Sequence, residues 1–247
     1  MKSEAMYREE FWKGKRDSLR GLFGLPKIKW LIDFVYMRAG LLRAKDQAKW
    51  VLSSCKPRNI LEIGCGYGEA IRFWHKKGYD ITGVEPDKHS CERINRKVGK
   101  GIAYCGSIEL FKSRQKYDLI IMSHVLEHLE NLPGFFKTTD KLLKKDSAIF
   151  VEVPNCEHKL TLEDSRSNPA HLHHFTSKSL KKEFITQCYV IARQETLISK
   201  LDLITEKGLS KFQRVKRLFD VLVAKDKSVK APANKANIIR LIAVKNK

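Results

Sequence analysis

Three glycines at alternate positions, directly after an apolar run, are the residues whose spacing most clearly indicates chemistry. Residues 59–63 suit a buried parallel strand, and the glycines follow in the sequence Glu62-Ile63-Gly64-Cys65-Gly66-Tyr67-Gly68. Glycine allows a backbone to turn sharply and to approach a bulky ligand closely. The pattern therefore predicts a strand that turns onto a ligand, followed by a helix over about 69–77.

The spacing of these glycines indicates which kind of ligand the turn receives. A loop that holds the pyrophosphate of a dinucleotide has the pattern G-x-G-x-x-G, whereas here the pattern is G-x-G-x-G and Glu69 takes the place of the third glycine. A carboxylate at that point repels a pyrophosphate, and no Gly-Lys-Ser or Gly-Lys-Thr follows to form a phosphate-binding loop. The sequence therefore favours a nucleoside without phosphates.

A second acidic residue, Glu85, ends the next expected strand, residues 80–85. Open α/β sheets bind ligands at the carboxyl ends of their strands, where a carboxylate can accept hydrogen bonds from both hydroxyls of a ribose. The alternative is that Glu85 only stabilises the start of a helix near Pro86, since carboxylates favour a first turn. The distance between Glu85 and the glycine loop favours the ribose interpretation.

The glycine loop, Glu85 and the run Tyr117–Leu129, which contains Leu-Glu-His, together resemble the class I S-adenosylmethionine-dependent methyltransferases. The similarity covers about residues 58–198 and a last strand near 237–244. It is with the branch that has a Leu-Glu-His motif after strand four and an H-x-x-H-F-T-x-x-S-L segment, here His171 to Leu180. The resemblance implies S-adenosylmethionine as the cofactor.

The resemblance also implies which residues contact this cofactor. Glu62 and the glycine loop would hold its methionine end and Glu85 its ribose, and Ile108 would stack on its adenine. Ser107 departs from the family, because an aspartate usually stands at this adenine-binding position. The complete expected set is Glu62, Gly64, Cys65, Gly66, Tyr67, Gly68, Glu85, Pro86, Ser107, Ile108 and Ser123.

His124, Glu127 and His128 follow the fourth expected strand and can converge on one point. In one interpretation His124 or His128 is a general base that Glu127 orients. In a second, the three residues bind a divalent metal, because related enzymes that act on quinone-type phenols or RNA 3′ ends have E-x-x-E-H ligands; a leading histidine shifts the preference from magnesium toward manganese, iron or zinc. In a third, Glu127 and His128 only cap a helix or bond to the backbone.

A second group of histidines, in the sequence His171-Leu172-His173-His174-Phe175-Thr176, follows the fifth expected strand. In similar proteins this segment lies over the acceptor cleft. One of its histidines, with His174 favoured, would be the base or complete a metal site with His124 and His128. The alternative is that these histidines are exposed and have no role.

Strand-like and helix-like patterns alternate along the chain, which predicts an α/β fold of the Rossmann-like type. We expect a seven-stranded, mostly parallel sheet with helices on both faces, and the resemblance implies that its last strand is antiparallel. Thr176 or Ser177 is expected to cap a helix that runs to about Thr186. The expected strands are at about 58–63, 80–85, 101–105, 117–122, 147–153, 189–198 and 237–244.

Two regions flank or interrupt this pattern. Residues 1–56 form an expected N-terminal helical extension, with helices over 28–37 and 41–52, that either covers the ligand cleft or packs on the sheet edge. Residues 57–247 form the expected methyltransferase domain, with a basic insertion at about 200–236. An amphipathic helix in this insertion would dock on its own domain or lie on an anionic surface.

The net charge of +20, from 48 Lys and Arg against 28 Asp and Glu, indicates either a highly soluble surface or an anionic partner such as RNA or a membrane surface. The six cysteines form no C-x-x-C pair, so we expect reduced thiols in a cytoplasmic protein, or one peripheral to a membrane. No segment reads as a secretory signal or a transmembrane helix.

We therefore predict an S-adenosylmethionine-dependent methyltransferase that methylates oxygen in a small molecule or glycan, with a histidine as general base. A metal-assisted RNA 2′-O-methyltransferase is the first alternative. The second is a non-catalytic nucleoside-binding protein whose basic flanks recruit anionic partners.

Overall fold

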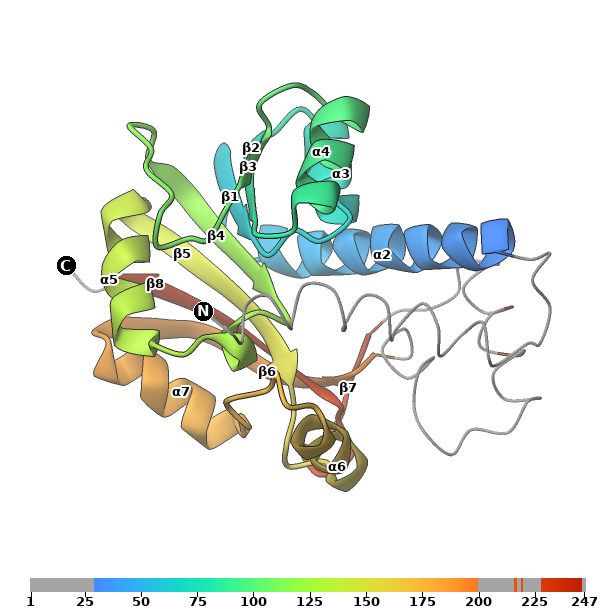
Figure 1. Cartoon of the computed structure of the whole chain (residues 1–247). Coiled ribbons are helices and arrows are strands. Elements are labelled where there is room, and N and C mark those ends of the chain that lie inside the picture. Colours follow the sequence, from blue (N-terminus) through green and yellow to red (C-terminus); the bar gives the residue numbers. More distant parts are fainter. Residues whose placement is uncertain (1–28, 200–215, 217–218, 220–227, 246–247) are drawn as a thin grey trace.

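The computed structural model of the chain describes residues 29–199, 216, 219 and 228–245. They form one sheet with helices on both faces, as Figure 1 shows. The strand order is β3-β2-β1-β4-β5-β8-β6-β7. Its strands are β1 Asn59–Ile63, β2 Asp80–Glu85, β3 Ala103–Cys105, β4 Tyr117–Ser123, β5 Leu143–Pro154, β6 Tyr189–Ile198, β7 Val229–Lys230 and β8 Ile238–Lys245.

The sheet confirms the predicted Rossmann-like fold and differs from it in one strand. Strands β1 to β5 pair in parallel, and β8 lies antiparallel between β5 and β6. The expected number of seven strands is wrong for the described residues, because the two-residue strand β7 adds an eighth at the edge, antiparallel to β6. Two residues are too few to give a strand pattern in a sequence.

Two layers of helices cover the sheet because strand residues alternate between its faces. Leu119 and Ile121 of β4 belong to one core, with side chains from α2 Lys29–Leu52, α3 Glu69–Lys76 and α4 Lys88–Lys97. Ile120 and Met122 belong to the other core. That second core contains side chains from α5 Leu132–Leu142 and α7 Ser177–Thr186, while α6 Lys159–Ser167 precedes the histidine segment.

The predicted N-terminal cap of α7 is confirmed, since the Thr176 hydroxyl accepts a hydrogen bond from Ser179 N at 3.1 Å. The prediction of two helices over 28–37 and 41–52 is wrong, because α2 is continuous through Gly40. A Cβ atom at Gly40 would lie 2.7 Å from Glu69 Cγ. The glycine that looks like a helix breaker instead lets α2 approach α3.

Four of the six cysteines are free, and the other two form a disulfide between Cys91 of α4 and Cys105 of β3. The expectation of six reduced thiols is therefore wrong for this pair. The two residues stand 14 positions apart with no motif between them, and only the packing of α4 beside β3 brings their Cα atoms to 5.6 Å. The disulfide removes one argument for a cytoplasmic location.

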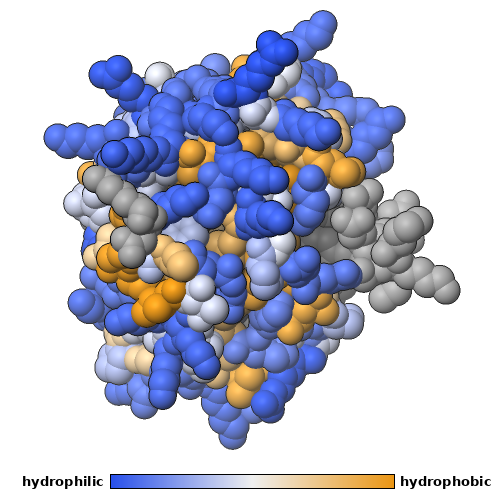
Figure 2. Space-filling view, turned by 90° about the vertical axis from the view of Figure 1, so that its left-hand side faces the viewer, coloured by the Kyte–Doolittle hydropathy of each residue, from blue (hydrophilic) through white to orange (hydrophobic). Residues whose placement is uncertain are grey.

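About half of the basic flanks, residues 1–56 and 206–247, lies outside the described residues. Of the expected helix in the 200–236 insertion, Lys216 and Phe219 are described, and both are helical and exposed. No described helix is long and apolar enough to cross a membrane. Hydrophilic side chains prevail on the face shown in Figure 2, as expected from the net charge of +20.

Candidate active site

The turn between β1 and α3 has the backbone shape that the alternate glycines predict. The φ angles of Gly64, Gly66 and Gly68 are 71°, 50° and 81°, a region that glycine adopts without strain. A Cβ atom would lie 2.4 Å from a Val125 carbon if added at Gly64, and 2.4 Å from an Ile94 carbon if added at Gly68. The turn therefore requires glycine for both conformation and space.

Glu85 fastens this turn to the end of β2. Its Oε2 accepts a hydrogen bond from Gly66 N at 2.7 Å, and its Oε1 accepts one from Asp87 N at 2.9 Å. The N-terminal cap of α4 is Asp87, whose carboxylate accepts from Ser90 N at 2.8 Å. Glu85 is thus not the helix cap of the alternative interpretation, and its carboxylate lies at the carboxyl edge of the sheet beside the glycines.

Glu62 places a buried carboxyl group beside the turn. Burial first, and then the nearby carboxylates of Glu69 and Glu85, raise the pKa of Glu62 to about 8. Within the described part of the chain, Glu62 Oε2 has no hydrogen-bond partner although it is buried. A buried carboxylate in this state favours a cationic ligand group, which would restore its charged form.

The other expected cofactor residues vary in how they face the turn. Cys65 is buried, and a Cβ atom at Gly83 would lie 2.8 Å from its sulfur, so only its backbone is available to a ligand. The Arg93 guanidinium lies 4.8 Å from the centre of the Tyr67 ring. Ile108 is 4% exposed and belongs to the core, whereas Pro86 and Ser107 are half-buried. Their roles toward adenine and ribose stay predictions.

His124 lies at the tip of β4 in an unusual conformation, with φ at 55°. Its imidazole lies between two buried carboxylates: Nδ1 is 3.4 Å from Glu127 Oε1, and Nε2 is 3.8 Å from Glu152 Oε1. A non-glycine residue in this region costs roughly 1–3 kcal/mol, and such strain is most often found at functional sites. The side chains of His124 and Glu127 lie close together, as the sequence predicts.

Glu127 is the buried centre of a cluster that it forms with His124 and His128. It lies in the single 3₁₀ turn Leu126–His128 and is 1% exposed. Burial acts to raise the pKa of Glu127, but the contact with His124 and the charges of His124 and His128 outweigh it, so that this pKa is below its usual value. Among the described residues, neither of its carboxylate oxygens makes a regular hydrogen bond.

His128 is oriented by the histidine segment. Its Nδ1 donates to the Ala170 carbonyl at 2.8 Å, which leaves the Nε2 lone pair, 4.0 Å from Glu127 Oε1, to accept a proton or a metal ion. The His171 ring meets the His128 ring edge-on, with centroids 4.7 Å apart. Ligand atoms of Glu127, His128 and His171 all lie within 4.8 Å of one another. The metal-ligand geometry thus includes His171 rather than the expected His124.

The segment folds back in this way because Leu172 N and His173 N both donate to the Glu127 carbonyl, at 2.8 and 3.1 Å. The favoured histidine of the sequence, His174, is exposed, and its Nδ1 lies 2.8 Å from the Ser165 hydroxyl. The His171 Nδ1 contacts the same hydroxyl at 2.9 Å. His171 is therefore nearer the cluster than His174, although both belong to the H-x-x-H pattern.

Two further polar residues meet the cluster and carry no motif. Gln47 Nε2 donates to Ser123 Oγ at 2.9 Å and to Glu152 Oε1 at 2.8 Å. Ser123 Oγ also donates to Glu152 Oε1, at 3.2 Å, so the hydroxyl of this expected cofactor residue is engaged within the protein. Gln47 comes from α2 and Glu152 from β5, and no spacing in the sequence connects them.

An open sheet of this order, with a glycine turn and carboxylates at the carboxyl ends of β1 and β2, defines the class of S-adenosylmethionine-dependent methyltransferases. The chain belongs to the methyltransferase-domain family, whose model matches residues 33–186. This match extends from α2 to the end of α7 and includes both the glycine turn and the histidine cluster.

The individual relatives match this chain at low identity and over only part of its length. The chain is 33% identical over 112 residues to a ubiquinone biosynthesis O-methyltransferase from Pelagibacter ubique, covering 42% of this chain and 47% of that protein. It is 25% identical over 128 residues to a protein of the same name from Bradyrhizobium, covering 50% and 51%. The matches thus span about half the length of these relatives. A methyltransferase structure from Archaeoglobus fulgidus has a TM-score of 0.60 at 18% identity, covering 83% of this chain and 93% of that one.

The residues of the turn fit S-adenosylmethionine. Its ammonium group suits the buried Glu62 carboxylate, and its ribose hydroxyls suit Glu85, which keeps acceptor capacity beside two backbone bonds. The space that a Cβ would fill at Gly64 and Gly68 is taken by neighbouring side chains, so the backbone itself must form the ligand surface.

Binding of the cofactor is expected to release a proton. With a pKa of about 8, Glu62 is mostly protonated at pH 7 in the free protein, and an ammonium partner favours the ionised form. Titration calorimetry at pH 7 in buffers of different ionisation enthalpy should show up to about one proton released. Glu62→Gln should abolish the release and weaken binding about tenfold or more, whereas Glu92→Gln, at an exposed carboxylate of α4, should change neither.

Proposed function

We propose that this chain transfers the methyl group of S-adenosylmethionine to a hydroxyl oxygen of a small molecule. The observation that carries the proposal is the buried Glu127 carboxylate among His124, His128 and His171, at the carboxyl end of the strand next to the glycine turn. Proton removal from a hydroxyl requires such a group within reach of the donor. The name of the ubiquinone-biosynthesis relatives supports oxygen as the acceptor atom.

Some residues of the chain bind the methyl donor, and others remove the proton of the acceptor. When bound, S-adenosylmethionine supplies an electrophilic methyl group. Glu62 holds the ammonium group and Glu85 the ribose, so that the donor is fixed against the end of β4. His128 accepts the hydroxyl proton at Nε2, because its Nδ1 is held as a donor by Ala170. Glu127 stabilises the imidazolium that forms, and His124 holds Glu127 in place.

A divalent cation is a second way to achieve the same chemistry, and the positions of Glu127, His128 and His171 favour it. These donors, one carboxylate and two imidazoles, suit manganese, iron or zinc better than magnesium. The hydrogen bond from His128 Nδ1 to a carbonyl is the outer contact that metal-binding histidines usually make. A bound cation would lower the pKa of the acceptor hydroxyl, which would make a base less necessary.

Chelation distinguishes the two forms of the site. If His128 acts as a general base, activity should be unchanged after treatment with EDTA and removal of the chelator. If a cation takes part, activity should fall at least tenfold and return with manganese or zinc. Metal analysis of the purified protein gives an independent result, because His171→Ala should lower the bound metal without changing cofactor affinity.

The acceptor is tested by incubating the protein with methyl-labelled cofactor and fractionated cell extract. We expect the label in small, non-polymeric molecules with phenolic or sugar hydroxyls. Label in RNA, with an activity that falls steeply as salt rises, would favour the 2′-O-methyltransferase and give the charge of +20 a role. Cofactor binding without transfer to any fraction would favour a non-catalytic nucleoside-binding protein.

A further inference from the structure

A row of polar side chains lies between α2 and the sheet, where apolar packing is the usual arrangement. Glu152 of β5, Arg240 of β8 and Glu195 of β6 are opposite one another in register. Three residues on one face of α2 each contact one member of this row: Gln47 meets Glu152 at 2.8 Å, Asp46 meets Arg240 at 2.8 Å, and Trp50 meets Glu195 at 3.0 Å.

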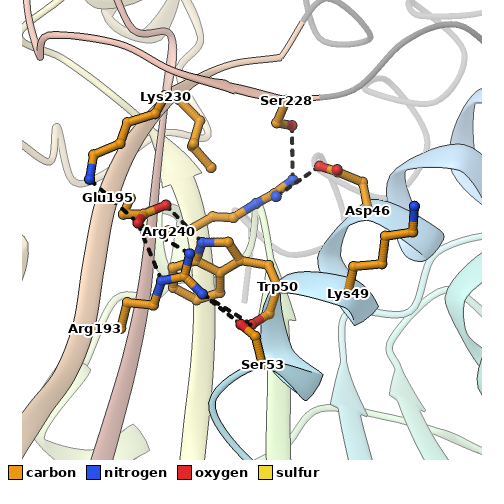
Figure 3. Close-up of a pocket in the computed structure, with 10 residues that line it drawn as sticks. Asp46, Lys49, Trp50, Ser53, Arg193, Glu195, Ser228, Lys230 and Arg240 are labelled. Carbon is orange, nitrogen blue, oxygen red and sulfur yellow. Dashed lines mark hydrogen bonds and ion pairs between the residues drawn. The ribbon is translucent and has the colours of Figure 1, made fainter.

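Figure 3 shows the outer part of this row, where Asp46, Arg240, Trp50 and Glu195 line a pocket of about 350 Å³. The pocket is at one end of the row, and its dashed contacts show that Arg240 is held from α2 on one side and from Ser228 on another. Glu152 is at the other end of the row, where its partner Gln47 of α2 also contacts Ser123 at the end of β4.

The two carboxylate oxygens of Glu152 have different hydrogen-bond partners. Oε2 accepts from Arg240 Nε. Oε1 accepts from Gln47 Nε2 at 2.8 Å and from Ser123 Oγ at 3.2 Å, and it lies 3.8 Å from His124 Nε2. The backbone carbonyl of Glu152 also accepts from His124 N at 2.8 Å. Both the side chain and the backbone of Glu152 therefore contact His124.

The buried ion pair of Glu152 and Arg240 is an expensive way to attach a helix. Glu152 and Arg240 are 0% and 2% exposed, and removing two charges from water often costs as much as their attraction returns. Apolar residues would attach α2 equally well. Polar contacts also fix the position of α2 on the sheet, because Gln47 can donate to Ser123 and Glu152 together only when α2 is in one position.

The position of α2 matters because His124 is held in a conformation it would not otherwise adopt. Its φ of 55° persists only where the surroundings determine it, and Glu152 is the residue that contacts it through two different groups. Gln47 donates to the same Oε1 that faces His124. A change at Gln47 therefore reaches His124 through one intervening carboxylate.

We propose that Gln47 of α2 is a positioning residue for methyl transfer: by joining Ser123 to Glu152 it fixes the carboxylate that holds His124, and through His124 it fixes Glu127. This role rests on the proposed function, in which the acceptor reacts beside Glu127. It also assigns α2 a part in the acceptor side of the site, in addition to its contact with Glu69 of α3.

Gln47→Met tests the proposal because methionine has nearly the same size and no donor. We expect kcat, measured with a catechol such as 3,4-dihydroxybenzoate as the acceptor probe, to fall about 10- to 100-fold. The dissociation constant of S-adenosylmethionine and the melting temperature should stay close to those of the unchanged protein. Lys45→Met, at an exposed position of the same helix, should leave all three unchanged.

Nitrogen-15 NMR of the imidazoles provides a readout that a merely structural role would not move. The ring signals of His124, assigned by their loss in His124→Ala, should shift in Gln47→Met, whereas those of the exposed His75 and His89 should not. If Gln47→Met does not fold, Gln47→Asn, which keeps the amide and shortens its reach, serves for the same comparison.

Failure of this proposal is distinct from failure of the proposed function. An unchanged kcat and unmoved His124 signals in Gln47→Met, with Glu127→Gln inactive, would overturn the role of Gln47 alone. Turnover of the probe by Glu127→Gln at the full rate would overturn the function on which it rests. Equal losses of kcat and cofactor affinity in Gln47→Met would show that α2 supports the fold as a whole, which also contradicts the proposal.

Discussion

Replacing Gly64 with alanine is expected to increase the dissociation constant of the cofactor about 100-fold or more, which corresponds to a loss of about 2.7 kcal/mol of binding free energy. The added Cβ would lie 2.4 Å from Val125 Cγ2, and φ at Gly64 is 71°. The backbone must therefore move, and with it the Gly66 N–H that donates to Glu85. Titration calorimetry with S-adenosylmethionine measures the effect.

Gly78 provides the matched control for this substitution. Its φ of 83° imposes the same conformational cost on alanine, roughly 1 kcal/mol, but an added Cβ would have nothing within 4 Å. Gly78→Ala should lose some stability and bind the cofactor normally. Normal cofactor affinity in Gly64→Ala would contradict the placement of the methyl donor at this turn.

Glu127→Gln is expected to reduce methyl transfer about 1,000-fold while cofactor affinity stays within a factor of two, because the change removes the buried charge that His124 and His128 face. Glutamine keeps the size of the side chain, so the loss reports charge rather than space. Single-turnover transfer of labelled methyl groups to the catechol probe, with the cofactor dissociation constant measured in parallel, separates chemistry from binding.

Glu130→Gln removes an exposed carboxylate three residues further along and should leave the rate unchanged. A drop in cofactor affinity equal to the drop in rate for Glu127→Gln would mean that Glu127 supports the donor side instead. The melting temperature decides whether either variant has lost the fold, since loss of a buried ionic partner costs several kcal/mol.

Local patterns in the sequence predicted the glycine turn and the place of Glu85 at the end of the next strand. The turn at Gly64 to Gly68 and the carboxylate of Glu85 each depend on short-range chemistry: a glycine conformation, a strand end and a first helical turn. The cap at Thr176 is local in the same sense. Because such features involve neighbours within a few residues, their spacing carries most of the information.

The cluster of Glu127, where we propose that the acceptor reacts, depends on contacts between distant segments, and the sequence therefore predicted less of it. His171 meets His128 only because the segment after α6 folds back over Glu127, so the sequence favoured His174 instead. Gln47 and Glu152 are 105 positions apart, and Cys91 and Cys105 have no motif. Helix α2 continues through Gly40, where it packs on Glu69 of α3. This contact joins two separate helices and therefore leaves no local pattern in the sequence.

The positive charge of the chain bears on which kind of acceptor it receives. A membrane or RNA partner would act through the basic flanks, which the described residues include only in part. In the proposed function, a hydroxyl acceptor would be bound at the carboxyl edge, near the cluster of Glu127. Affinity for the acceptor probe that does not change between low and high salt would assign the charge to solubility or surface attachment rather than to the substrate.

The most direct test of the account is a calorimetric titration of the full chain with S-adenosylmethionine, followed by transfer of its labelled methyl group. We predict one binding site per chain, weakened by Glu62→Gln and lost in Gly64→Ala, and transfer that requires Glu127. No binding at millimolar cofactor, or binding that Gly64→Ala leaves intact, would contradict the account.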